Sequence, residues 1–94
     1  MSNTEQNYIP EQSNKRLILT TATWCGPCYG LKKRLEKDGF YSKIEIKDMD
    51  KEQPFFREHN IKSVPTLLII DNNTNTEYVQ GVDDIYKAIA KSVA

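Results

Sequence analysis

The chain has 94 residues, of which 38% are hydrophobic and 28% charged, and its 13 Lys and Arg balance 13 Asp and Glu. This length accommodates one compact domain with a composition typical of globular proteins. The balanced charge provides no net field for nucleic acid or an anionic membrane, and no apolar run is long enough to span a bilayer. We therefore expect one globular domain, a monomer, with neither nucleic acid nor membrane as a partner.

The first 15 residues are polar and predict a tail, followed by a single domain over residues 16–94. The tail has no apolar core and no small-residue cleavage site, so it does not resemble a secretory signal. We therefore expect a cytoplasmic protein. In a reducing compartment, two closely spaced cysteines are more often redox-active or metal-binding than a permanent structural disulfide.

The first strong structural signal is an apolar, β-branched run over residues 17–21, which predicts a strand buried on both faces. It leads directly into the motif WCGPC at residues 24–28. Apolar residues then follow at spacings of three and four, which predicts a helix that begins at the cysteine pair. Gly39 suits the C-cap of this helix.

The middle of the chain predicts a second strand and a second helix. Ile44 and Ile46 alternate with charged residues, as in a strand. Residues 48–50 can begin a short helix, in which Pro54 lies early and residues 55–56 supply the apolar contacts.

The last third predicts a hairpin and a terminal helix. Residues 67–70 are continuously apolar, residues 71–73 have turn composition, and residues 77–79 form the returning strand. The acidic residues 83–84 suit a helix start, and apolar residues repeat every four positions after them. The predicted order is βαβαββα, which is an α/β fold.

The pair Cys25 and Cys28 has the spacing that thiol–disulfide exchange requires, because a second thiol must lie close to the attacking thiolate. At a helix start, free N–H groups and the helix dipole favour the Cys25 anion, whereas Cys28 lies on the apolar stripe and should be shielded. We therefore assign Cys25 as the nucleophile and Cys28 as the resolving cysteine. Gly26 permits the tight entry into the helix, and Pro27 stiffens the loop at little cost.

Trp24 is expected to place an apolar wall beside the attacking sulfur. The alternative for this motif is half of a zinc site, since Cys-x-x-Cys is also a metal-ligand spacing. Zinc normally takes four N or S ligands, and His59 is the only histidine in the chain. We therefore predict no metal.

The segment at residues 24–28 is the active-site motif of thioredoxins, and Val64-Pro65-Thr66 resembles the cis-proline loop that lies against the cysteines in that family. The resemblance covers residues from about 17 to the C-terminus. It implies a thioredoxin-like fold with a minimal βαβαββα core and a mixed four-stranded sheet flanked by helices. It also implies a cis Val64–Pro65 bond and a Val64 backbone that pairs with substrate.

Gly81 and Val82 lie at the spacing of a thioredoxin glycine that lets the substrate backbone approach. Read without the family, Gly81 is equally a glycine before a helix. The sequence departs from the family at Leu19 and Ile46, where thioredoxins usually carry a buried aspartate and its lysine neighbour. An apolar pair can be neutral or favourable for stability, but without a nearby base the deprotonation of Cys28 should be slower.

The resemblance implies a thiol–disulfide oxidoreductase that reduces protein disulfides without a bound cofactor and is recharged by a reductase of the thioredoxin reductase type. Ribonucleotide reductase is a family-typical client. Two alternatives stay open. The segment from Gly81 to Asp84 is similar to the glutathione-binding segment of glutaredoxins, with Asp83 and Asp84 as the carboxylates. The fold could also serve as a non-enzymatic docking module through Trp24, Val64 and Val82.

Overall fold

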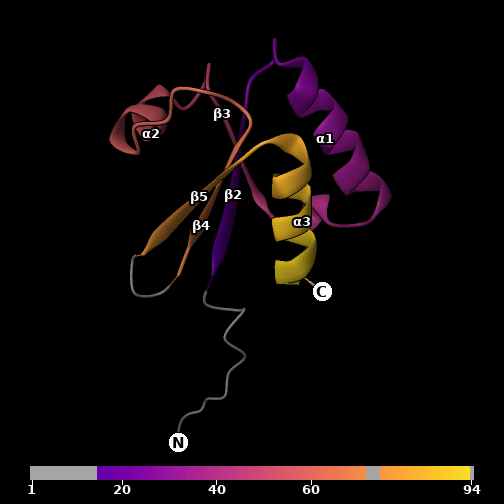
Figure 1. Cartoon of the computed structure of the whole chain (residues 1–94). Helices are drawn as coiled ribbons and strands as arrows, with labels where there is room; N and C mark the ends of the chain where they lie inside the picture. Colours follow the sequence, from indigo (N-terminus) through magenta and orange to yellow (C-terminus); the bar gives the residue numbers. More distant parts are fainter. Residues whose placement is uncertain (1–14, 72–74, 94) are drawn as a thin grey trace, which may run out of the picture.

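The computed structural model describes residues 15–71 and 75–93. In this part of the chain the elements are β2 (Arg16–Thr21), α1 (Gly26–Lys37), the 3-10 helix η2 (Tyr41–Lys43), β3 (Glu45–Asp48), α2 (Gln53–Glu58), β4 (Thr66–Ile70), β5 (Thr76–Gln80) and α3 (Val82–Val93) (Figure 1). The predicted tail, apart from Lys15, and most of the predicted turn at residues 71–73 lie outside the described residues.

The four strands form one mixed sheet in the order β3-β2-β4-β5. β2 runs parallel to β3, with Leu19 beside Ile46, and antiparallel to β4, with Thr20 beside Thr66. β4 and β5 are antiparallel neighbours. The predicted α/β fold with a mixed four-stranded sheet flanked by helices is confirmed.

The sheet separates two helical layers, with α1 and α3 on one face and α2 on the other (Figure 1). Side chains alternate across β2 because successive strand residues point to opposite faces. Leu17 and Leu19 join the cluster under α1 and α3, whereas Ile18 joins the cluster under α2. β2 is therefore apolar on both faces, as its continuous apolar run predicts.

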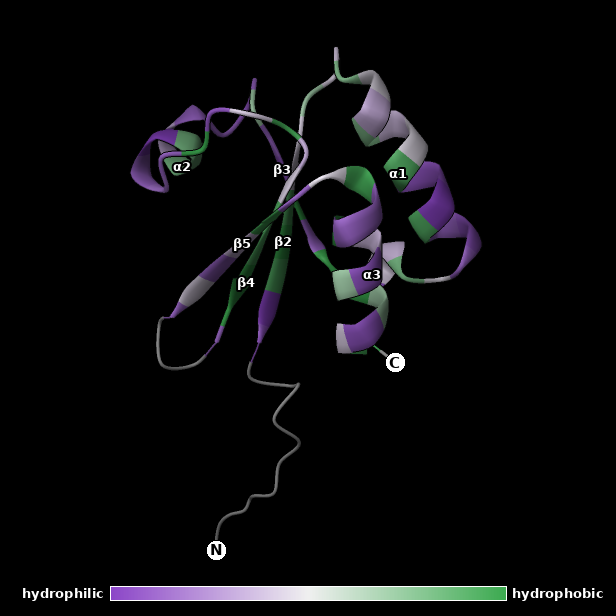
Figure 2. Ribbon diagram, in the orientation of Figure 1, coloured by the Kyte–Doolittle hydropathy of each residue, from purple (hydrophilic) through white to green (hydrophobic). Residues whose placement is uncertain are grey.

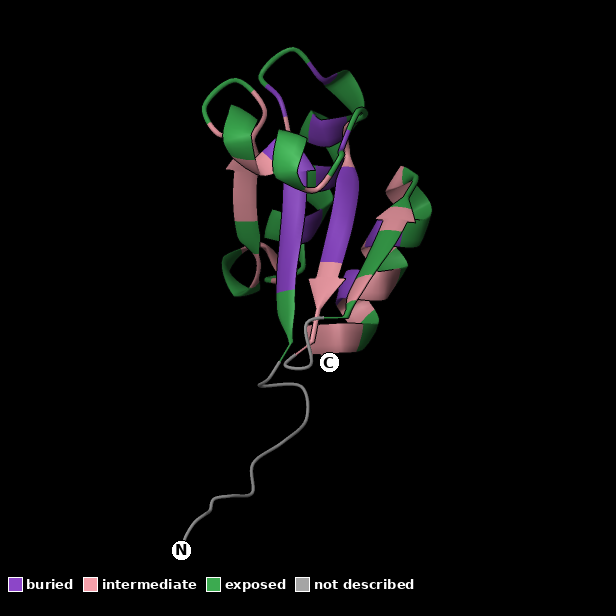
Figure 3. Ribbon diagram, turned by 90° about the vertical axis from the view of Figure 1, so that its left-hand side faces the viewer, coloured by how far each residue is buried: buried purple, intermediate pink, exposed green. Residues whose placement is uncertain are grey.

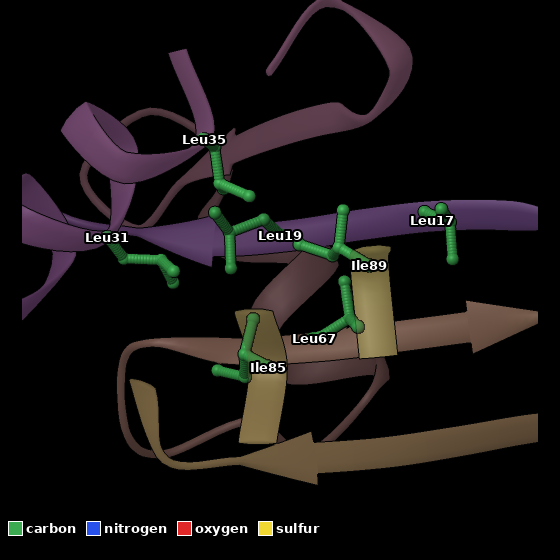
Figure 4. Close-up of a cluster of buried hydrophobic side chains, with 7 residues drawn as sticks. All are labelled: Leu17, Leu19, Leu31, Leu35, Leu67, Ile85 and Ile89. Atoms are coloured by element: carbon green, nitrogen blue, oxygen red, sulfur yellow. The ribbon is translucent and has the colours of Figure 1, made fainter. Parts of the chain in front are cut away.

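The larger cluster lies between the sheet and the two long helices, and Figure 4 shows its buried members converging from β2, α1, β4 and α3. They are Leu17, Leu19, Leu31, Leu35, Leu67, Ile85 and Ile89. The smaller cluster consists of Ile18, Phe56, Ile61 and Leu68. The most hydrophobic strands are the two central ones (Figure 2), and these are also the strands buried along most of their length (Figure 3).

Helix α1 ends in a turn that only glycine accommodates without strain. Gly39 has φ +78°, in the left-handed region, and its N–H donates to the Glu36 carbonyl at 3.1 Å. The Phe40 N–H donates to the Leu35 carbonyl at 2.8 Å, which completes a Schellman motif. The predicted C-terminal glycine of this helix is thus confirmed.

Polar side chains join α1 to α3 outside the core. Arg34 pairs with Asp83 at 3.0 Å and lies over the ring of Tyr86, 4.2 Å from its centroid. The Tyr86 hydroxyl donates to the Asp38 carboxylate, and this hydrogen bond raises the pKa of Tyr86. These contacts therefore hold α1, which begins at the active-site motif, beside α3, the last helix.

The second helix begins later than the sequence suggests. Asp48 is the last residue of β3, and its Oδ1 accepts the Asp50 N–H at 2.8 Å. Residues 49–51 form a turn, Glu52 is the N-cap residue, and α2 starts at Gln53. An aspartate that bonds the backbone two residues ahead favours a turn over a helix. The short η2 is a further element that the sequence patterns did not predict. In the described part of the chain, no helix has the length and apolar character needed to cross a membrane.

Candidate active site

The WCGPC motif bridges the end of β2 and the start of α1, and its two cysteines form a disulfide with a Cα–Cα distance of 5.3 Å. Cys25 is the N-cap residue of α1, with an extended backbone. Its N–H donates to the Ala22 carbonyl at 3.1 Å, and its Sγ accepts the Cys28 N–H at 3.1 Å. Gly26 and Pro27 form the first turn, where the missing N–H of proline costs no hydrogen bond.

The helix start thus gives Cys25 the electrostatic setting that the sequence predicts. A sulfur at the N-cap receives a helix N–H and lies at the positive end of the helix dipole, which stabilises a thiolate. The burial of the two cysteines differs less than we expected, since Cys25 is 7% exposed and Cys28 is 3% exposed. Their different positions on the helix distinguish them more clearly than their exposure does.

The Val64–Pro65 bond is cis, as the resemblance implies, and the loop lies against the cysteine pair. The Val64 carbonyl oxygen is 3.8 Å from the Cys25 Sγ. In the disulfide the sulfur has no proton, so this is a close approach. In the reduced protein the Cys25 thiol can donate to the carbonyl at this position.

Three side chains hold this loop in place. Thr20 and Thr66 are both buried, and the Thr20 Oγ1 donates to the Thr66 carbonyl at 2.7 Å and accepts its N–H at 3.0 Å. The Thr66 Oγ1 donates to the Ser63 carbonyl at 2.9 Å, and the Gln80 side chain donates to the Ser63 hydroxyl at 3.1 Å. The loop is therefore tied to β2 on one side and to β5 on the other.

Gly81 lies beside the cis-proline. Thr66 pairs with Gln80, so Pro65 and Gly81 are the next residues beyond the last antiparallel pair. Gly81 has φ +94°, and its carbonyl accepts the Ile85 N–H at 2.8 Å as α3 begins. Val82 is half-buried and packs against the main core. The structure therefore brings Gly81 to the cysteine end of the sheet, and Val82 contributes to the core there.

The surface beside the cysteines is aromatic. Trp24 is 64% exposed and Tyr29 is 63% exposed, and both flank the disulfide in the sequence. A cavity of about 250 Å3 reaches Cys25 and Cys28, and Tyr29 lies on its wall. Leu19 and Ile46 both line this cavity, so the apolar replacements noted in the sequence share it with the resolving cysteine.

Comparison with known proteins decides the family. A family model described as Thioredoxin matches residues 2–93. The chain belongs to the thioredoxin family. A thioredoxin-like protein of Synechocystis is 31% identical in an alignment of 72 residues that covers 72% of this chain and 69% of that protein. Two H-type thioredoxins of Arabidopsis thaliana are 29% and 28% identical over 86% of this chain.

The matched regions make up 59% and 65% of those two plant proteins, so the chain spans less than two thirds of their length. Among solved structures, the oxidised thioredoxin of Plasmodium falciparum is 26% identical with a TM-score of 0.69, over 89% of this chain and 86% of that one. Spinach chloroplast thioredoxin f is also 26% identical, with a TM-score of 0.65, over 86% and 78%. Thioredoxin homologues are protein-disulfide oxidoreductases, and the Cys25–Cys28 disulfide is consistent with that activity.

Two of the residues considered for the alternative functions, His59 and Asp83, have other contacts. His59 follows α2, where its ring packs 4.5 Å from that of Phe55. Within residues 15–71 and 75–93, no three metal-ligating side chains gather into a possible metal site. Asp83, a candidate glutathione ligand, pairs with Arg34, while Asp84 is exposed in the first turn of α3.

The sequence patterns did not identify Thr20 as the residue that holds the cis-proline loop of this thioredoxin-family site in place. A hydroxyl inside an otherwise apolar buried strand was the available signal, because a buried polar side chain must find a hydrogen-bond partner. The partner could not be found from the sequence alone, since Thr66 lies 46 residues away and is reached only through the antiparallel pairing of β2 and β4.

Proposed function

We propose that this chain reduces protein disulfides by dithiol exchange through Cys25 and Cys28. One observation carries the proposal: the Cys25 Sγ caps α1, is bonded to Cys28, and lies 3.8 Å from the Val64 carbonyl of the cis-proline loop. This arrangement combines a stabilised thiolate, a resolving thiol and a backbone group that can orient the substrate.

The reaction proceeds in two exchanges. The Cys25 thiolate attacks one sulfur of the client disulfide, so that a mixed disulfide forms and one client thiolate leaves. Cys28 then loses its proton and attacks the Cys25 sulfur, which forms the disulfide seen in the structure and releases the second client thiolate. Two electrons pass from the cysteine pair to the client, whose two thiolates take up protons.

The cis-proline loop supports the binding of an extended client segment. The Val64 backbone lies beside the reacting sulfur, and a peptide could pair with it as an added strand. The exposed Trp24 side chain offers an apolar surface next to that segment. A separate reductase would return the pair to the dithiol state without a bound cofactor, and a reducing cytoplasm suits this direction of exchange.

The first experiment measures insulin disulfide reduction by the whole chain, supplied with NADPH and thioredoxin reductase or with NADPH, glutathione and glutathione reductase. We expect activity in the first system and none for Cys25→Ser. Activity only with glutathione would instead support the glutaredoxin-like alternative and give Asp83 and Asp84 a binding role. Inactivity in both systems, with a pair that dithiothreitol can reduce, would contradict the proposal and favour a docking module. Electron donation to ribonucleotide reductase is a finer prediction, for which the same assay would use that enzyme as client.

A further inference from the structure

The resolving exchange requires an acceptor for the Cys28 proton. Cys28 is 3% exposed and packs against Ala22 and Cys25, so its thiol has little direct contact with bulk solvent. The cavity of about 250 Å3 is the space that reaches it, and the exposed Tyr29 lies on its wall. A water molecule needs only about 10–15 Å3 of such space, so the cavity can hold several.

The walls of this cavity change from apolar to polar along β2 and β3. Leu19 and Ile46 are neighbours in the parallel register and both line the cavity. The next pair on the same face is Thr21 and Asp48, which also line it. Two residues of strand correspond to about 6–7 Å. A carboxylate is therefore present in the same cavity, one pair further along the strands than the apolar pair.

The titratable side chains on the cavity wall, besides the cysteines, come from three elements. Tyr29 and Lys32 come from α1, Tyr41 comes from η2, and Asp48 comes from β3. The Lys32 ammonium lies over the Tyr41 ring, 5.6 Å from its centroid. Among the residues that line the cavity, Asp48 is the only carboxylate, and carboxylates are a common type of general base.

Other charged groups near the end of β3 do not line the cavity and have partners of their own. The Asp50 Oδ2 accepts the Thr23 hydroxyl at 3.2 Å, and the Lys47 ammonium lies 3.8 Å from the Glu52 carboxylate. The Asp48 carboxylate is oriented by the Asp50 N–H, which donates to its Oδ1 at 2.8 Å. This bond leaves Oδ2 available for a water molecule in the cavity.

We propose that Asp48 accepts the proton of Cys28, through water in this cavity, during the resolving exchange. The proposal rests on the proposed function. As the Cys28–Cys25 bond forms and the bond from Cys25 to the client breaks, the Cys28 proton passes by water to the Asp48 carboxylate. It then moves to the departing client thiolate or to solvent. During recharging, Cys28 leaves as a thiolate and regains a proton by the same route.

The test separates the two exchanges with 5,5′-dithiobis(2-nitrobenzoate), an aromatic disulfide. Attack by Cys25 releases one coloured thiolate, and resolution by Cys28 releases the second. We compare the whole reduced chain with Asp48→Asn and Asp50→Asn in stopped flow at neutral pH. The amide introduced by Asp48→Asn keeps a carbonyl oxygen for the Asp50 N–H. Asp50→Asn removes the same charge two residues away, at a residue that does not itself line the cavity, and its amide oxygen can still accept the Thr23 hydroxyl.

For Asp48→Asn we expect the first release to stay within about twofold of wild type and the second to slow at least about tenfold, as for loss of a general base. The deficit should shrink as pH rises, because hydroxide replaces the missing base. Electrostatics alone predicts the opposite sign, since removing a nearby negative charge favours the Cys28 thiolate. Asp50→Asn should leave both phases near wild type.

Rescue of the second release rate by a small carboxylate distinguishes a proton acceptor from a residue with a purely structural role. Added formate should raise the second rate of Asp48→Asn in proportion to its concentration and leave wild type unchanged. A second phase in Asp48→Asn as fast as wild type, or slowed without a response to pH or formate, would overturn the role of Asp48. If wild type released no second thiolate at all, the proposed function itself would fail, so the two failures are distinguishable.

Discussion

The hydroxyl of Thr20 fixes the position of the cis-proline loop. It makes two hydrogen bonds to the main chain of Thr66, at 2.7 and 3.0 Å, in a region where both residues are buried. The Val64 carbonyl that faces the reacting sulfur is two residues away. A side chain on β2 thus positions a group that the chemistry needs, although it does not touch the reacting atoms itself.

Thr20→Val should therefore affect both stability and client binding. We expect a loss of about 1–3 kcal/mol in the free energy of unfolding, because the buried Thr66 N–H loses its side-chain acceptor. The displaced loop should raise KM for insulin more than it lowers kcat. Urea unfolding and steady-state insulin reduction measure the two effects.

Thr20→Ser is the matched control, because it keeps the hydroxyl and removes one methyl group. It should restore KM to near the wild-type value while some stability is still lost through the smaller buried surface. Equal KM values for Thr20→Val and wild type would show that the loop does not depend on this hydroxyl.

At the scale of an element, one glycine inside α1 and one in the turn that ends it have conformations that predict opposite effects of the same substitution. Gly39 has φ +78° beyond the C-terminus of the helix, whereas Gly30 lies within it, and an added Cβ meets nothing within 4 Å at either position. Gly39→Ala should cost about 1–2 kcal/mol, because an L-residue with a Cβ is strained there. Gly30→Ala should stabilise by about 0.5–1 kcal/mol, because alanine loses less backbone entropy in a helix.

Urea unfolding of the two variants side by side gives the comparison. Because the substitution and the absence of steric contacts are the same, a difference in sign isolates the backbone conformation. Destabilisation by Gly30→Ala would mean that this position is not held as an ordinary helix residue.

A bidentate ion pair joins β2 to β3 at their first residues. Arg16 donates two hydrogen bonds of 2.8 Å to the Glu45 carboxylate, and the hydrogen bond from Arg16 lowers the pKa of Glu45. A carboxyl with a lowered folded-state pKa stabilises the protein above its unfolded pKa, and this contribution disappears as pH falls through the folded pKa. Both side chains are about half exposed, so the pair should contribute less than about 1 kcal/mol.

Glu45→Gln should therefore be slightly less stable than wild type at pH 7, and the difference should vanish in acid below the lowered pKa of Glu45. Urea midpoints from pH 7 downward measure this convergence. The same comparison in high salt should also reduce the difference, since exposed charges are screened. A difference that grew as pH fell would contradict the assigned direction of the pKa shift.

The elements could be predicted where the pattern is local. The continuous apolar run gave β2, the three-and-four spacing gave α1, and Gly39 marked the end of that helix. The start of α2 was placed too early, because the turn that Asp48 forms with Asp50 competes with a helix. The pairing of Thr21 with Asp48 beside Cys28 depends on strand register, which no local pattern contains.

At the scale of the whole molecule, one face of the sheet depends on α3 for its cover. Ile85 and Ile89 are fully buried and pack on Leu17, Leu19 and Leu67 from the two central strands (Figure 4). A domain of this size buries a small core and has a marginal net stability of about 5–15 kcal/mol. The packing of α3 therefore contributes to the free energy of unfolding of the whole domain, including the end of the sheet that carries the cysteine pair.

Ile89→Ala should remove about 2–5 kcal/mol, because it deletes methyl groups from a closed cluster and leaves a cavity. At about 4–8 °C per kcal/mol for a domain of this length, Tm should fall by at least about 8 °C. Lys91→Ala, on an exposed position of the same helix, should change Tm little. Below the transition the folded Ile89→Ala protein should keep both thiolate release rates, because Ile89 does not line the cavity beside Cys28. Slower release at low temperature, with the protein fully folded, would instead mean that packing under α3 is coupled to the geometry of the cysteine pair.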